Sequence, residues 1–357
     1  MKCLTHTISA HAVQPGEDFH AAASDRSLVM PPNPRRRVAI GAIALMAAAS
    51  LAPAPTWAAD WPDKPVKIVV PFAAGGATDL LARALGAELG KIWRQPILVD
   101  NRPGAGGALG ADVVAKSPAD GYTLLLASGS QFTVNQFIYQ KLPYTIKSFE
   151  MITKVAGGPM VVTVNTSVPV RSLRELLSHG KANPGQLHFA SAGNGSQVHM
   201  AGEAFADASG LDLVHVPYKG EGPAYADLMG GAVQMAVGNI NAISPLLKGG
   251  RLRALAVTGK ERSALLPEVP TAAESGLSGF EFIGWFGLTA PTGTPKSLID
   301  KIYADVQQAS EQPGMKRYLA EQGMTLSVTG PDAMKTDITS ESARWKELIA
   351  KRKINAN

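Results

Sequence analysis

Residues 71–79, PFAAGGATD, join the apolar run 66–70 to an apolar-periodic segment at 80–89. This order predicts a strand, a glycine loop and a helix. The first N–H groups of a helix have no partner within it and favour an anion, and adjacent glycines let the main chain approach a ligand closely. Thr78 and Asp79 either cap the helix or line the cavity. The stretch therefore predicts an anion-facing loop, with an ordinary strand-to-helix turn as the alternative.

The same order of features returns further along the chain. The run 187–190 predicts a strand, the loop SAGNGSQ at 191–197 is rich in small residues, and 198–208 has the apolar spacing of a helix. Two such units indicate two anion-facing walls. A cleft between them would bind a small solute.

Strands and helices alternate over most of the chain. The apolar runs 97–100 and 122–127 each precede a loop of small polar residues, and helical segments separate the runs. This alternation predicts an α/β fold with a mainly parallel sheet. Ligands of such sheets lie beyond the carboxyl ends of the strands, where Ser128 also falls.

The N-terminal segment has the pattern of a secretory leader. Three arginines at 35–37 precede the apolar run 38–49, and small residues follow up to Asp60. This pattern predicts a signal peptide over 1–58, cleaved after Ala58, and a location in the periplasm. Met30 is a second candidate for the start of the chain. The residues around the arginines match a twin-arginine signal poorly.

Composition agrees with export and argues against nucleic-acid binding. The single cysteine, Cys3, lies in the leader, so the exported chain has no thiol and suits an oxidising compartment without disulfides. Removing 1–58 lowers Lys plus Arg from 34 to 29 and Asp plus Glu from 29 to 26, so the net charge falls from +5 to +3. No basic run typical of a nucleic-acid-binding protein is present in the sequence.

Catalytic and cofactor motifs are weak. The exported chain contains neither a Gly-x-Ser-x-Gly elbow nor a His-x-x-x-His pair, so we expect no metal and no catalysis. Ser196 and His199 would share a helix face, which leaves a serine-dependent hydrolase as the weaker alternative to a packed or ligand-touching histidine. The glycines of 104–110 do not indicate a dinucleotide cofactor, because the acid Asp100 precedes them. Gly106 and its neighbour are better explained by close packing at the rim of the cleft.

Several motifs together resemble the Bug family, the extracytoplasmic solute receptors of tripartite tricarboxylate transporters. The motifs are Trp61-Pro62, the 71–79 stretch, Asn101-Arg102-Pro103-Gly104-Ala105-Gly106-Gly107, Asp120-Gly121-Tyr122, Tyr218-Lys219-Gly220, Pro267-Glu268-Val269-Pro270-Thr271 and the run 285–295. Each motif is short, but their order along the chain is highly specific, and the resemblance covers nearly all of 61–357.

The resemblance implies a two-domain periplasmic binding protein of type II-like fold, with a mainly parallel sheet flanked by helices in each domain and two interdomain crossovers. Domain one would comprise 60–162 plus 284–357, and domain two 163–283. Such a receptor, a non-catalytic monomer, captures a small carboxylate-containing ligand in the cleft. It then delivers this organic acid to integral-membrane transporter subunits. Presenting the ligand to a sensor protein in signalling is the alternative.

The resemblance also implies which residues contact the ligand. On one wall they are Phe72, Ala74, Gly76, Thr78 and Asp79; on the other they are Ser191, Gly193, Asn194, Ser196 and His199; Ser128, Tyr218 and Lys219 complete the set. Many family members have a cleft-facing Asp at the position of Gly238, which Asn239 follows here. Without that acidic acceptor, we expect an unsubstituted carboxylate, bulky or aromatic, rather than an amine-bearing ligand.

Overall fold

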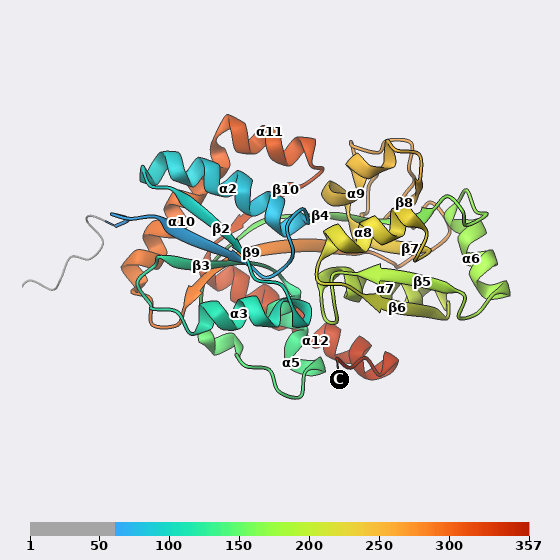
Figure 1. Ribbon diagram of the computed structural model, residues 1–357, viewed down its shortest axis with the longest axis horizontal. Helices are drawn as coiled ribbons and strands as arrows, with labels where there is room; N and C mark the ends of the chain where they lie inside the picture. The colour runs from blue at the N-terminus through green and yellow to red at the C-terminus, as the bar shows by residue number, and fades with distance from the viewer. Residues whose placement is uncertain (1–60, 357) are drawn as a thin grey trace, which may run out of the picture. The chain divides into compact units, whose positions relative to one another are not determined.

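The computed structural model describes residues 61–356. The predicted leader over 1–58, its cleavage site and Met30 lie outside the described residues. Within 61–356, no helix combines the length and the apolar character needed to cross a membrane. In Figure 1 the strands form a sheet, and helices lie on both of its faces.

The strands are β1 Val66–Val70, β2 Ile97–Asn101, β3 Thr123–Ser128, β4 Phe149–Asn165, β5 Leu187–Ser191, β6 Leu213–Pro217, β7 Met235–Asn239, β8 Leu252–Val257, β9 Ile283–Pro291 and β10 Thr325–Thr329. The helices are α2 Ala77–Trp93, α3 Ala108–Ala115, α4 Ser130–Thr133, α5 Asn135–Ile138, α6 Leu173–Ala182, α7 Gln197–Ser209, α8 Glu221–Gly230, α9 Ile240–Leu247, α10 Lys296–Glu311, α11 Pro313–Glu321 and α12 Pro331–Arg352. The two predicted strand, loop and helix units are thus present, as β1 with α2 and β5 with α7.

All ten strands of the described range form one continuous sheet. Its main order is β2-β1-β3-β9-β4-β7-β5-β6, and β8 and β10 also pair with β4. The pairs β1–β2, β1–β3, β5–β6 and β5–β7 are parallel, whereas β9, β8, β7 and β10 run antiparallel to β4. The sheet is therefore parallel where the two loops face the site and antiparallel where the chain crosses between its halves.

β4 divides the sheet into two lobes. Its residues 149–159 pair with β9, and its residues 160–165 pair with β7 and β8. We call 61–159 plus 283–356 lobe one and 160–282 lobe two. Because β4 continues through both lobes, strand pairing alone sets no domain boundary, and the boundaries 60–162, 163–283 and 284–357 stay a prediction.

Each lobe buries the apolar stripe of the helix that follows its glycine loop. In lobe one, α2 buries Leu81, Leu85 and Leu89 in the same apolar core as Ile68 of β1. These leucines are four residues apart, so they share one helix face. In lobe two, Phe205 of α7 is fully buried in a core with strand residues of that lobe. This packing fixes where the first turn of each helix points.

The lobes contact each other through main chain as well as side chains. The Tyr139 hydroxyl of lobe one donates to the Asn194 carbonyl of lobe two (2.8 Å), and the Ala73 N–H donates to the Lys219 carbonyl (3.2 Å). A Cβ on Gly106 would lie 1.8 Å from the Asn194 carbonyl oxygen. The expected role of Gly106 in close packing at the rim is therefore confirmed.

Replacing Gly106 by Ala is expected to lower the free energy of unfolding by more than about 1 kcal/mol, because its φ of +57° is unfavourable for other residues and the new methyl meets Asn194. Chemical denaturation of the purified chain measures this change. Gly230→Ala is the matched control, since a Cβ there meets no atom within 4 Å. Equal stability of Gly106→Ala and the wild type would contradict this contact.

Candidate functional site

The two loop and helix units face one small cavity between the lobes. Its lining residues are Phe72, Gly76, Thr78, Ser128, Ala192, Ser196, Gln197, Val198, Glu221, Asn239 and Phe286. The cavity has a volume of about 10 Å³, which is room for about one water molecule. The lobes must therefore move apart to admit a ligand.

The first turn of α2 forms the lobe-one wall. Gly76 is the N-cap residue and carries no side chain to bind the turn, so the Ala77 N–H donates instead to Oε2 of Glu221 from lobe two (2.8 Å). Thr78 lines the cavity and is 4% exposed. The unpaired N–H groups of this helix start favour a carboxylate, and Glu221 provides it.

Asp79 orders the glycine loop and does not line the cavity. Its Oδ2 accepts from the Gly75 N–H (3.0 Å), and its Oδ1 accepts from Asn101 Nδ2 (3.1 Å) and Arg83 (2.8 Å). Burial acts to raise the pKa of Asp79, but the hydrogen bond from Arg83, with those from Gly75 and Asn101, outweighs it and lowers the pKa. The charged Asp79 carboxylate therefore stabilises the glycine loop through these hydrogen bonds.

The first turn of α7 forms the lobe-two wall. Ser196 is its N-cap, and its Oγ accepts from the His199 N–H (3.2 Å). Gln197 joins the lobes, because its Oε1 accepts from the Trp285 N–H (2.9 Å) and its Nε2 donates to Asn239 Oδ1 (3.1 Å). Ser196 already satisfies the His199 N–H, whereas the N–H groups of Gln197 and Val198 have no partner within the helix and are available to an anion in the cavity.

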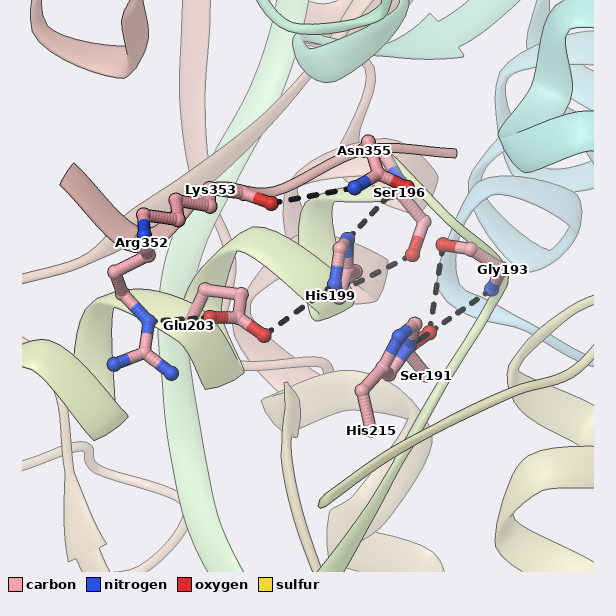
Figure 2. Close-up of polar contacts among 10 residues, drawn as sticks. Ser191, Gly193, Ser196, His199, Glu203, His215, Arg352, Lys353 and Asn355 are labelled. Atoms are coloured by element: carbon pink, nitrogen blue, oxygen red, sulfur yellow. Dashed lines mark hydrogen bonds and ion pairs between the residues drawn. The ribbon is translucent and has the colours of Figure 1, made fainter. Parts of the chain in front are cut away.

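A stacked histidine pair, His199 buried and His215 half-buried, lies beside this wall, as Figure 2 shows. The rings of His199 and His215 stack with centroids 3.8 Å apart, and Ser191 Oγ lies 2.5 Å from His215 Nε2. Burial, and secondly His199, lower the pKa of His215 to about 3, so the ring is neutral and shares a hydrogen bond with the Ser191 hydroxyl. The pair stabilises the loop that carries Ser196.

Arg352 connects this histidine pair to the C-terminal helix. His199 Nε2 lies 3.6 Å from Glu203 Oε1, and Glu203 also forms a hydrogen bond with Arg352 of α12 (Figure 2). Burial acts to raise the pKa of Glu203, and the hydrogen bonds with His199 and Arg352 lower it overall. The chain of contacts fastens α12 of lobe one to α7 of lobe two.

The geometry does not support a catalytic serine. Ser196 Oγ binds the backbone N–H of His199, and Nδ1 of His199 accepts from the Gly195 N–H (3.0 Å). The imidazole therefore meets main chain and Glu203 rather than the Ser196 hydroxyl. Among residues 61–356 no group of His, Cys, Asp and Glu could hold a metal ion.

The structure brings part of the predicted ligand-contacting set together. Phe72, Gly76, Thr78, Ser128 and Ser196 line the cavity. The others lie behind the walls or at the rim: Ala74, Asp79, Ser191, Gly193, Asn194, His199, Tyr218 and Lys219. Ala74 and Lys219 are exposed. Their part in ligand binding stays a prediction.

Sequence reasoning missed Ala192, Gln197, Val198, Glu221, Asn239 and Phe286. Glu221 is the most consequential of them, because it is charged and buried. It opens α8, whose start the sequence analysis did not locate at this residue. A helix starting at Glu221 places Pro223 inside the first turn, where proline is well tolerated.

Comparison with known proteins identifies the class. Rpa4515 from R. palustris, whose structure contains adipate, is 34% identical with a TM-score of 0.80, over 83% of this chain and 99% of that chain. MatC from Rhodopseudomonas palustris, with bound malate, is 32% identical with a TM-score of 0.77, over 81% and 100%. These neighbours indicate the two-domain α/β fold of periplasmic binding proteins, which are solute-binding proteins and not enzymes.

The chain belongs to the tripartite tricarboxylate transporter receptor family, also called the Bug family. Residues 81–354 match the family described as tripartite tricarboxylate transporter family receptor. Protein BugT of Bordetella pertussis is 37% identical over 298 residues, which cover 83% of this chain and 91% of that protein. The resemblance found in the sequence is thereby confirmed.

Replacing His215 by Gln is expected to flatten the acid dependence of stability. His215 titrates near 6.5 in the unfolded chain and near 3 in the folded chain, so between these values the unfolded state binds more protons and stability falls as pH falls. From pH 7 to pH 5 the wild type should lose about 2 kcal/mol more than His215→Gln. Denaturant titrations at both pH values measure this difference.

His188→Gln is the control for removing a histidine, because His188 lies on β5 and is not part of the stacked pair. Equal losses of stability in the wild type and in His215→Gln over this pH interval would contradict the assignment of a neutral His215.

Proposed function

We propose that this protein is an extracytoplasmic receptor that binds a small carboxylate-containing ligand in the cavity between its lobes. It acts in the periplasm and delivers the ligand to integral-membrane subunits of a tripartite tricarboxylate-type transporter. Adipate in Rpa4515 and malate in MatC support a carboxylate as the ligand of this relative.

The main support for the proposal is that the first turns of α2 and α7 both line the same cavity. Thr78 from lobe one and Ser196 from lobe two contribute hydroxyl groups, and the first turns of α2 and α7 contribute main-chain N–H groups. Such donors stabilise a carboxylate without a cationic side chain. The Ser128 hydroxyl also lines the cavity but donates to Gln131 Oε1 (2.8 Å). Because the donors come from both lobes, closing the lobes on a ligand completes the site.

A thermal-shift screen tests the proposal. The chain beginning at Ala59 is mixed with mono-, di- and tricarboxylates, aromatic acids, amino acids and neutral controls, because a ligand of the folded state raises the melting temperature by mass action. We expect one class of carboxylates to raise it selectively. A flat response to every acid, together with a shift from a neutral control, would contradict the proposal.

The change Thr78→Val is expected to weaken binding of the best carboxylate by about 1–3 kcal/mol, because it removes a buried hydroxyl next to a charged ligand while keeping the shape of the side chain. Isothermal titration calorimetry measures the affinity. Thr336→Val, on the exposed surface of α12, is the matched control. Unchanged affinity of Thr78→Val would remove Thr78 from the site.

A further inference from the structure

Glu221 supplies the only charged side chain among the cavity-lining residues of the described chain. The lining contains neither Lys, Arg nor His. Glu221 is 5% exposed and belongs to the first turn of α8 in lobe two. One end of the ligand cavity is therefore a fixed carboxylate rather than a cation.

Lobe two holds this carboxylate in place. Its Oε1 accepts from the Tyr225 hydroxyl (2.7 Å) and from Asn239 Nδ2 (2.8 Å), both in lobe two. Burial, and secondly the charge of Glu221, raise the pKa of Tyr225 well above its ordinary value, so the phenol remains a donor. Only the bond from the Ala77 N–H to Oε2 crosses to lobe one. The carboxylate position therefore does not depend on contact between the lobes.

Gly238 makes room for this arrangement. A Cβ at Gly238 would lie 2.0 Å from the Tyr225 hydroxyl oxygen, so a side chain at this strand end would displace the phenol that holds Glu221. The loss of an acid at Gly238 thus does not leave the cleft without an acidic acceptor. The sequence-based expectation against an amine-bearing ligand rested on position 238 alone and did not include Glu221.

Glu221 has acceptor capacity left for a ligand. A carboxylate offers about four lone-pair sites. Three bonds reach Oε1, from the Tyr225 hydroxyl, from Asn239 Nδ2 and from the Asn239 N–H (3.4 Å), and the Ala77 N–H takes one of the two sites on Oε2. Oε2 lies beside Gly76, which also lines the cavity: a Cβ there would be 3.2 Å from this oxygen. A ligand N–H group placed in the cavity can therefore donate to Oε2.

The charge of Glu221 discriminates between ligands. A second ligand carboxylate near Oε2 would meet a like charge in a buried site that has no cationic side chain in its lining. An amide or ammonium group at the same place would gain a charge-assisted hydrogen bond. The first turn of α7, at the wall formed by Ser196 and Val198, remains available to the ligand's own carboxylate.

We propose that Glu221 determines ligand specificity: the receptor takes a carboxylate that also bears an amide or ammonium group, with the carboxylate at the start of α7 and the nitrogen at Glu221. This inference rests on the proposed function. It predicts that simple dicarboxylates are poor ligands, in contrast to the adipate and malate found in the related structures.

Calorimetry with matched compounds tests the inference. Succinate, glutarate and adipate are each compared with their monoamides and with the amino acids in which a terminal ammonium replaces one carboxylate. We expect the wild-type chain to bind a monoamide or amino acid at least tenfold more tightly than the dicarboxylate of the same series. In Glu221→Gln we expect this preference to fall at least tenfold, because the amide can donate to a second carboxylate.

Glu261→Gln is the control, since Glu261 is exposed and is not one of the lining residues, and it should keep the wild-type preference. If Glu221→Gln does not fold, the inference is still tested by whether the wild-type chain binds the monoamide or amino acid more tightly than the dicarboxylate. The inference is contradicted if a dicarboxylate binds the wild type as tightly as its monoamide does. It is also contradicted if Glu221→Gln binds the dicarboxylate, the monoamide and the amino acid all more tightly than the wild type does. If no compound of these series binds but another class of carboxylate raises the melting temperature, the inference fails and the proposed function stands; if no carboxylate of any class binds, the proposed function itself fails.

Discussion

The first turn of α2 is the constraint on which the cleft depends. Its N–H groups have no intrahelical partners and need an acceptor in a buried place. Gly76 contributes no capping side chain, and the turn obtains its acceptor from Glu221 across the cleft. The bond from the Ala77 N–H to Glu221 thus joins the helix start of lobe one to lobe two and places a carboxylate in the cavity lining.

Local sequence pattern was sufficient for the two binding units. Apolar runs followed by small-residue loops and helical spacing predicted β1 with α2 and β5 with α7, because these elements form mainly from neighbours in the chain. The first half of β4 and the short β10 were not predicted. Residues 149–159 acquire their strand structure from pairing with β9, more than a hundred residues away, and β10 is half-buried and only five residues long.

The site was predictable in part for the same reason. The sequence predicts Thr78 and Ser196 because each lies at a predicted helix start. The role of Glu221 depends on its contacts with Tyr225, Asn239 and Ala77, which only the tertiary structure brings together. The case of Gly238 shows the limit of comparing single positions. Position 238 carries no acid, but Glu221 on a different element lines the cavity, and a side chain at Gly238 would displace the Tyr225 phenol that holds Glu221.

A crystal structure of the chain with its tightest-binding carboxylate is the most direct test of this account. We predict the ligand inside the cavity between the lobes, with its carboxylate within hydrogen-bond distance of Ser196 Oγ or of the first-turn N–H groups of α7. A ligand bound instead in the open hollow on the outer side of α2, which Arg83, Lys91 and Arg94 line, would contradict the assignment of the site.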